Sequence, residues 1–144
     1  MWTLLLLAAL GGAAIALQAL VNARLQQAAG NPILAASISF AVGLAGLLAV
    51  LPLSRGGSVS ALGFAPWWAW IGGLLGAFYI VMSILLLPRI GAAALISAVV
   101  LGQMVFSIVA DHYGLLGTHV REATPLRLLG GLLLVAGVVL IRTR

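Results

Sequence analysis

The sequence has no cysteine and no lysine, and only two of its 144 residues are acidic. The lack of cysteine excludes disulfide bonds, thiolate metal sites and a thiol nucleophile. Charged residues make up 6% of the chain and hydrophobic residues 64%, whereas a soluble domain carries about a quarter charged residues. So few charges cannot cover a water-exposed surface, and the composition therefore indicates a protein that lies in a lipid bilayer.

The apolar residues form runs long enough to cross a bilayer. A hydrocarbon core of about 30 Å is spanned by roughly 20 helical residues. We therefore expect an all-α integral membrane protein with a single transmembrane domain over residues 1–144. The five predicted spans are at about 2–24, 33–53, 67–87, 91–113 and 125–141. The fifth is bounded closely by Arg127 and Arg142, and a re-entrant or surface helix is the alternative there.

Capping residues and prolines predict where the helices begin and end. Asn31-Pro32 and Thr124-Pro125 each pair a helix-capping residue with a proline suited to the first turn, so a helix should start at each. The stretch Pro88-Arg89-Ile90-Gly91 is expected to separate the third and fourth spans, because proline disfavours helical geometry in the residue before it.

The seven arginines fall almost evenly on the two sides of the membrane. Five spans place Arg55, Arg121 and Arg127 on one side and Arg24, Arg89, Arg142 and Arg144 on the other. Orientation follows the excess of Lys and Arg on the cytoplasmic side, and three against four is almost no excess. The chain therefore either inserts in both orientations or takes a single one, with a cytoplasmic carboxyl terminus favoured by the small bias.

A few polar side chains lie inside the predicted spans, where each must find a partner or line a cavity. Gln18 and Asn22 are one turn apart in the first span, and Gln103 and Ser107 are one turn apart in the fourth. Tyr79 follows small residues in the third span. These five are candidate substrate contacts, although hydrogen bonds between helices would also explain them. A stripe of small residues in the second span is formed by Ser39, Gly43 and Gly46. Close packing of helices and the lining of a cavity are its two interpretations.

Charged residues near the span ends are candidates for a gate or for ion coupling, namely Arg24, Asp111 and His112. Asp111 falls near the membrane interface, where capping, or pairing with Arg121 or His112, is the alternative. Arg24 could equally extend its side chain to the headgroups. In the fifth span, small residues that let helices approach closely predict a packing surface for a partner. They are Gly130, Gly131 and Gly137.

Other functional classes have no support in the sequence. It contains no nucleophile-elbow, zinc-protease or nucleotide-binding motif, so we expect neither an enzyme nor a cofactor. His112 and His119 match no established metal motif. The arginines are spread over several loops rather than gathered on one face, which argues against a nucleic-acid partner.

The segment from Gly102 to Gly114 resembles the signature of the YdcZ-like family in the drug/metabolite transporter superfamily. It contains a Gly-Gln pair, then Ser107, then Asp111-His112-Tyr113-Gly114. Other parts of the chain agree with the family, namely Gly12, Gln18, Asn22, Leu25, Asn31-Pro32 and Ser39-Phe40 near the start and Arg127, Gly130 and Gly137-Val138 near the end. The resemblance covers essentially the whole chain.

This resemblance implies a five-helix protein equivalent to one half of a ten-helix EamA-like transporter, whose halves are inverted repeats around a midplane substrate site. It implies an antiparallel homodimer in the bacterial inner membrane, with the first, third and fourth spans around the pathway. The small four-helix relatives have a glutamate in their first helix, whereas this chain has only Gln18 and Asn22 there. A neutral, zwitterionic or weakly anionic metabolite is therefore expected. The alternatives are pairing with a paralogue of opposite fixed orientation, and a membrane subunit that does not transport.

Overall fold

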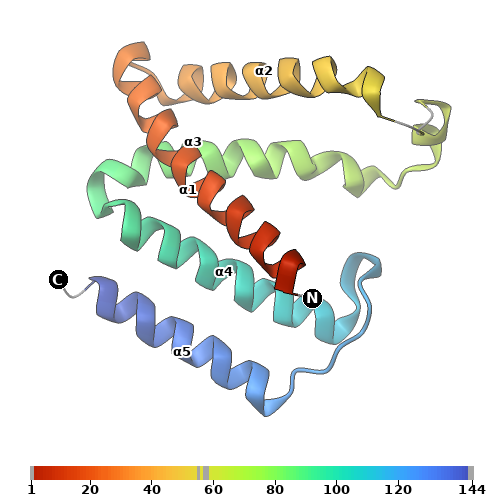
Figure 1. Ribbon diagram of the computed structural model, residues 1–144, viewed down its shortest axis with the longest axis vertical. Helices are drawn as coiled ribbons and strands as arrows, with labels where there is room; N and C mark the ends of the chain where they lie inside the picture. The colour runs from red at the N-terminus through yellow and green to blue at the C-terminus, as the bar shows by residue number, and fades with distance from the viewer. Residues whose placement is uncertain (1, 55, 57–58, 143–144) are drawn as a thin grey trace. The chain divides into compact units, whose positions relative to one another are not determined.

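The computed structural model describes residues 2–54, 56 and 59–142, so Arg55 and Arg144 lie outside the described residues. The described residues are helical with connecting turns and contain no strand, which confirms the all-α class (Figure 1). The α-helices are α1 (Trp2–Ala29), α2 (Pro32–Val50), α3 (Gly72–Ile90), α4 (Ala92–Tyr113) and α5 (Pro125–Arg142).

Within the residues that the structure describes, four helical stretches are long and apolar enough to cross a membrane. They are Trp2–Ala29, Pro32–Leu53, Trp67–Ile90 and Ala92–Tyr113. The fifth apolar helix, Pro125–Ile141, is shorter, so a fifth crossing stays a prediction. The stretch that contains α3 begins with a 3-10 turn, η3 (Trp67–Ile71).

The start of α2 confirms the prediction made from Asn31-Pro32. The Oδ1 atom of Asn31 accepts hydrogen bonds from the backbone N–H groups of Ile33 at 2.8 Å and Leu34 at 3.1 Å. Pro32 is the first helical residue, where its missing N–H costs nothing because the first N–H groups of a helix have no partner within it.

The break between α3 and α4 falls later than predicted. The helix continues through Pro88 to Ile90 and ends at Gly91, whose φ is 80°. A proline near the end of a helix removes one backbone hydrogen bond, whereas a positive φ ends the helical geometry, and glycine adopts it without a steric penalty. One non-helical residue therefore joins α3 to α4.

The chain forms two compact units, Met1–Arg89 and Ile90–Arg144, and each is described by itself. In the first unit, α1 packs against α2. A small core gathers Ala35 and Ala36 of α2 with Ile80 and Ile84 of α3. Gly76 of α3 lies close to Phe40 of α2, since a Cβ atom at Gly76 would be 3.4 Å from the Phe40 ring.

The second unit is a hairpin of α4 and α5, joined by residues 114–124 (Figure 1). Most large apolar side chains along both helices are exposed, for example Phe106 at 60% and Leu133 at 65%. Exposed apolar side chains of this kind are suited to contact lipid, which fits the membrane location indicated by the composition.

Candidate functional site

The polar residues of α1 have different surroundings within the first unit. The Gln18 side chain is exposed, whereas Asn22 is only 3% exposed. Arg24 is exposed, and its Nη1 atom donates to Oε1 of Gln27 at 3.0 Å on the same helix. Because α1 continues to Ala29, Arg24 lies within the helix and not at its end.

An open groove of about 490 Å³ runs between α1 and α2, and we call it the α1–α2 groove. Gln18 lines it from α1, and Ser39 and Gly43 line it from α2. The remaining lining is apolar and comes from Phe40, Ala41, Leu44 and Leu47. The structure therefore brings Gln18 together with two members of the stripe that the sequence suggested in the second span.

Tyr79 belongs to α3 of the same unit and packs against the small core of α2 and α3. Its hydroxyl is fully buried and has no hydrogen-bond partner among the described residues. An unpaired buried hydroxyl costs about 1–3 kcal/mol. The group consequently retains the capacity to bond a ligand or a water molecule that reaches it.

Gln103, Ser107 and Asp111 follow one another at intervals of four residues on α4, but their surroundings differ. Gln103 and Ser107 are exposed, and the Ser107 hydroxyl donates to the backbone oxygen of Met104 at 3.0 Å in its own helix. Each step of four residues turns a helix by about 40° beyond a full circle. Asp111 is two such steps from Gln103, and it faces α5 instead of sharing the surroundings of Gln103.

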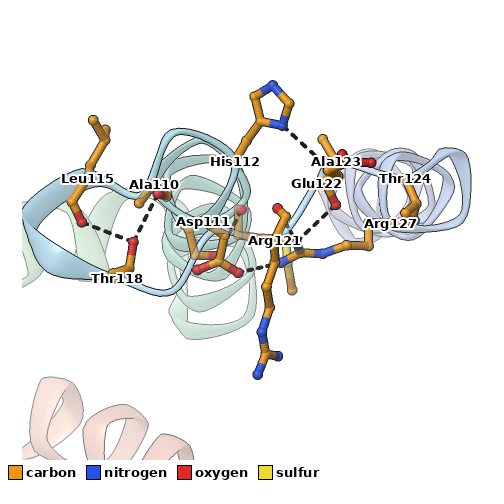
Figure 2. Close-up of polar contacts among 12 residues, drawn as sticks. Ala110, Asp111, His112, Leu115, Thr118, Arg121, Glu122, Ala123, Thr124 and Arg127 are labelled. Carbon is orange, nitrogen blue, oxygen red and sulfur yellow. Dashed lines mark hydrogen bonds and ion pairs between the residues drawn. The ribbon is translucent and has the colours of Figure 1, made fainter.

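Asp111 pairs with Arg127 of α5, at 2.5 Å between Oδ2 and Nη2 (Figure 2). The Nη1 atom of Arg127 also donates to the backbone oxygens of Arg121 at 3.1 Å and Glu122 at 3.4 Å. We call this arrangement the Arg127 clasp. The alternative that Asp111 pairs with Arg121 or His112 is wrong for its carboxylate. Its partner is Arg127 of the next helix, 16 positions along the chain.

Further hydrogen bonds hold the connection between α4 and α5 against the end of α4 (Figure 2). The Arg121 N–H donates to the backbone oxygen of Asp111 at 2.8 Å, and the Ala123 N–H donates to Nδ1 of His112 at 3.3 Å. The Thr118 hydroxyl lies 3.0 Å from the backbone oxygens of both Ala110 and Leu115. Asp111 and His112 thus have partners that stabilise this connection.

The three glycines of α5 do not share one environment. A Cβ atom at Gly131 would lie 3.9 Å from Cδ1 of Ile108, so this glycine faces α4 of its own chain. Gly137 lines a groove of about 220 Å³ between α4 and α5. A Cβ atom at Gly130 would meet no atom within 4 Å. The side of Gly130 is therefore open to a partner or to lipid.

Some of the residues that the structure connects carry no local sequence signal. Arg127 bonds to the Asp111 carboxylate, 16 positions away, and the Thr118 hydroxyl bonds to the backbone oxygen of Ala110, 8 positions away. No short motif encodes such contacts. Ser39 was visible as a polar residue of a small stripe, but its position opposite Gln18 depends on how α1 and α2 pack. Among the described residues, no group of three or more His, Asp or Glu side chains is placed to hold a metal ion.

Long apolar helices that carry a few polar residues define a multi-pass α-helical membrane protein. Residues 3–140 match the family described as "Putative inner membrane exporter, YdcZ". The chain belongs to this YdcZ family, which confirms the resemblance seen in the segment from Gly102 to Gly114.

A similar curated protein is the "Inner membrane protein YdcZ" of Escherichia coli (strain K12). It is 29% identical over 140 residues, which cover 92% of this chain and 90% of that protein. No solved structure matches the chain. The family's description and the name of this relative agree with the apolar helices, so the chain is a multi-pass inner membrane protein of a family described as membrane exporters.

Proposed function

We propose that the protein is a small secondary transporter of the drug/metabolite transporter superfamily, working as an antiparallel homodimer in a bacterial inner membrane and moving a small metabolite. The observation that carries this proposal is a set of polar groups on membrane helices that have no hydrogen-bond partner in the described part of the chain. The Tyr79 hydroxyl is buried there without such a partner, and Gln18 lines the α1–α2 groove. Lipid tails cannot pair with such groups, so a ligand or another chain has to do so.

The size of the chain supports the dimer. A transporter built from inverted repeats forms its substrate site where two oppositely oriented halves meet. Five helices make one half, so a second copy in the opposite orientation supplies the other. This requires that the chain insert both ways, which fits the near-even arginine count of three against four.

The proposed roles follow the groups described above. Gln18, Asn22 and Tyr79 of the first unit contact the substrate, as do Gln103 and Ser107 of the second. Arg24 is exposed on α1 and is proposed as a gate residue. Gly130 is proposed to contact the second copy, because a Cβ atom at this position would meet no described atom of another element within 4 Å.

Reporters of cytoplasmic and periplasmic location, fused to the carboxyl terminus, test the orientation. Both reporters are expected to be active in the natural chain. Arg89→Gln with Arg142→Gln removes arginines from one side, and Arg121→Gln removes one from the other. Each variant should shift the population toward one orientation, in opposite senses, because the Lys and Arg bias sets the topology. A natural chain found in a single orientation would exclude the homodimer and favour a paralogous partner.

Cysteine crosslinking tests the antiparallel arrangement, and the natural chain adds no background because it has no cysteine. Gly130 and Gly137 lie seven positions apart and so on one face of α5. They are also nearly symmetric about the middle of Pro125–Ile141. Two antiparallel α5 helices would place Gly130→Cys of one copy opposite Gly137→Cys of the other. Efficient crosslinks between two copies of Gly130→Cys, with none in the mixed pair, would contradict the proposal.

A further inference from the structure

The α1–α2 groove lies near the middle of its membrane span. Gly43 lines the groove and is about 16 Å along α2 from Pro32, at 1.5 Å per residue, whereas the whole stretch Pro32–Leu53 is about 33 Å long. The groove is thus at a depth where polar side chains meet no water from either side of the membrane.

Two polar groups line this groove, the Gln18 amide and the Ser39 hydroxyl. No hydrogen bond joins the Gln18 amide or the Ser39 hydroxyl to a described residue. Ser37, two positions earlier on α2, behaves differently, because its hydroxyl donates to the backbone oxygen of Ile33 at 2.9 Å. A serine hydroxyl in a helix commonly bonds to its own backbone in this way. Ser39 is therefore available for a ligand where Ser37 is not.

We infer that the α1–α2 groove binds a neutral small molecule with an apolar body and one hydrogen-bonding head, such as a primary amide, and that Ser39 recognises this head together with Gln18. The inference rests on the proposed transport function and names the substrate class. An amide side chain and a hydroxyl each donate and accept, so they complement a head that does both. No lining residue is charged, and an ion would lose its hydration there without gaining a counter-charge.

The size and lining of the groove favour this occupant over a lipid tail or a helix of a second copy. A volume of about 490 Å³ falls within the range of roughly 300–1,000 Å³ that is usual for small-molecule sites. A lipid tail would fill the apolar part and leave Gln18 and Ser39 unpaired. A helix of a second copy would need a polar side chain at the same depth on the facing surface.

Photolabelling of the full chain in liposomes tests the inference. The probe is 4-benzoylbenzamide, which is neutral and has an amide head. Benzophenone without a head and the anion 4-benzoylbenzoate are the matched probes. We expect 4-benzoylbenzamide to label α1 and α2 preferentially. Gln18→Leu and Ser39→Ala should each raise its half-labelling concentration about three- to ten-fold, as the loss of one hydrogen bond would. Ser37→Ala should leave it unchanged, and Ser39→Thr should retain most of the binding.

Two outcomes would overturn the inference. Equal labelling by benzophenone would mean that the groove holds lipid-like molecules. Stronger labelling by 4-benzoylbenzoate would exclude a neutral ligand.

Flux of tritiated 4-benzoylbenzamide into proteoliposomes separates the site from the transport function. Labelling that depends on Gln18 and Ser39, without flux, would support the site and contradict transport. Flux that is indifferent to both substitutions would support transport and contradict the site.

Discussion

Replacing Arg127 with methionine is expected to release the connection between α4 and α5. The Arg127 guanidinium pairs with the Asp111 carboxylate and donates to the backbone oxygens of Arg121 and Glu122. Methionine keeps an unbranched apolar stem in place of the aliphatic part of arginine and removes every side-chain donor. All three contacts of the Arg127 clasp are therefore lost together.

The magnitude follows from the exposure of the pair. The Arg127 and Asp111 side chains are 32% and 28% exposed, so the ion pair resembles a partly exposed one and contributes up to about 1 kcal/mol. The two bonds to backbone oxygens contribute about 0.5 kcal/mol each, at the low end because one of them is long. The sum is about 2 kcal/mol, which corresponds to about a 30-fold change in a local opening equilibrium.

Hydrogen exchange in nanodiscs measures this opening at single amides. The Arg121 N–H, bonded to the Asp111 backbone oxygen, should exchange about 30-fold faster in Arg127→Met, because exchange reports local opening. Arg121→Met is the matched control, since the Arg121 guanidinium points away from Asp111 and bonds to no described residue (Figure 2). Exchange that is unchanged in Arg127→Met, or equally fast in Arg121→Met, would refute the clasp.

Two further substitutions test local geometry by thermal unfolding. Gly114→Ala should destabilise the protein by more than Gly117→Ala. Both glycines have a positive φ, at 62° and 84°, so an alanine at either position costs about 1–2 kcal/mol in backbone strain. At Gly114 the added Cβ atom would also lie 2.9 Å from Cγ2 of Val120. Equal losses would show that the contact with Val120 has no effect. Asn31→Ala should lower the free energy of unfolding by about 1 kcal/mol, because it removes the side-chain cap of α2. Asn31→Asp should keep the cap and most of the stability. An equally large loss of stability in Asn31→Asp would argue against capping.

The positions of helices could be predicted from the sequence wherever the cause is local. Asn31-Pro32 marks the start of α2 because the cap and the first-turn proline act on neighbouring amides. The same local reasoning misplaced the end of α3. The prediction relied on the backbone restriction that a proline places on the residue before it, at Pro88. The helix instead ends where Gly91 adopts a positive φ. The sequence alone does not reveal that angle.

The contacts of the candidate site could be predicted only in part. Helical spacing identified Gln18 and Asp111 as polar positions, but it could not supply their neighbours. Asp111 meets Arg127 because two helices fold back on each other, and Ser39 meets the groove that Gln18 lines because α1 packs on α2. Such pairings depend on tertiary packing, which periodicity along one helix does not encode.

The connections between the helices differ in length, and the long ones can be used to detect the orientation of the chain in the membrane. Gly30 and Asn31 join α1 to α2, and Gly91 alone joins α3 to α4. The connections that include residues 54–66 and 114–124 are much longer. Long connections accept inserted tags and are cut by proteases, whereas such short ones are not. If every helix crosses the bilayer, both long connections emerge on the same surface. An epitope within residues 54–66 would then be accessible on one surface of sealed vesicles for a fixed orientation, and on both for a chain that inserts either way.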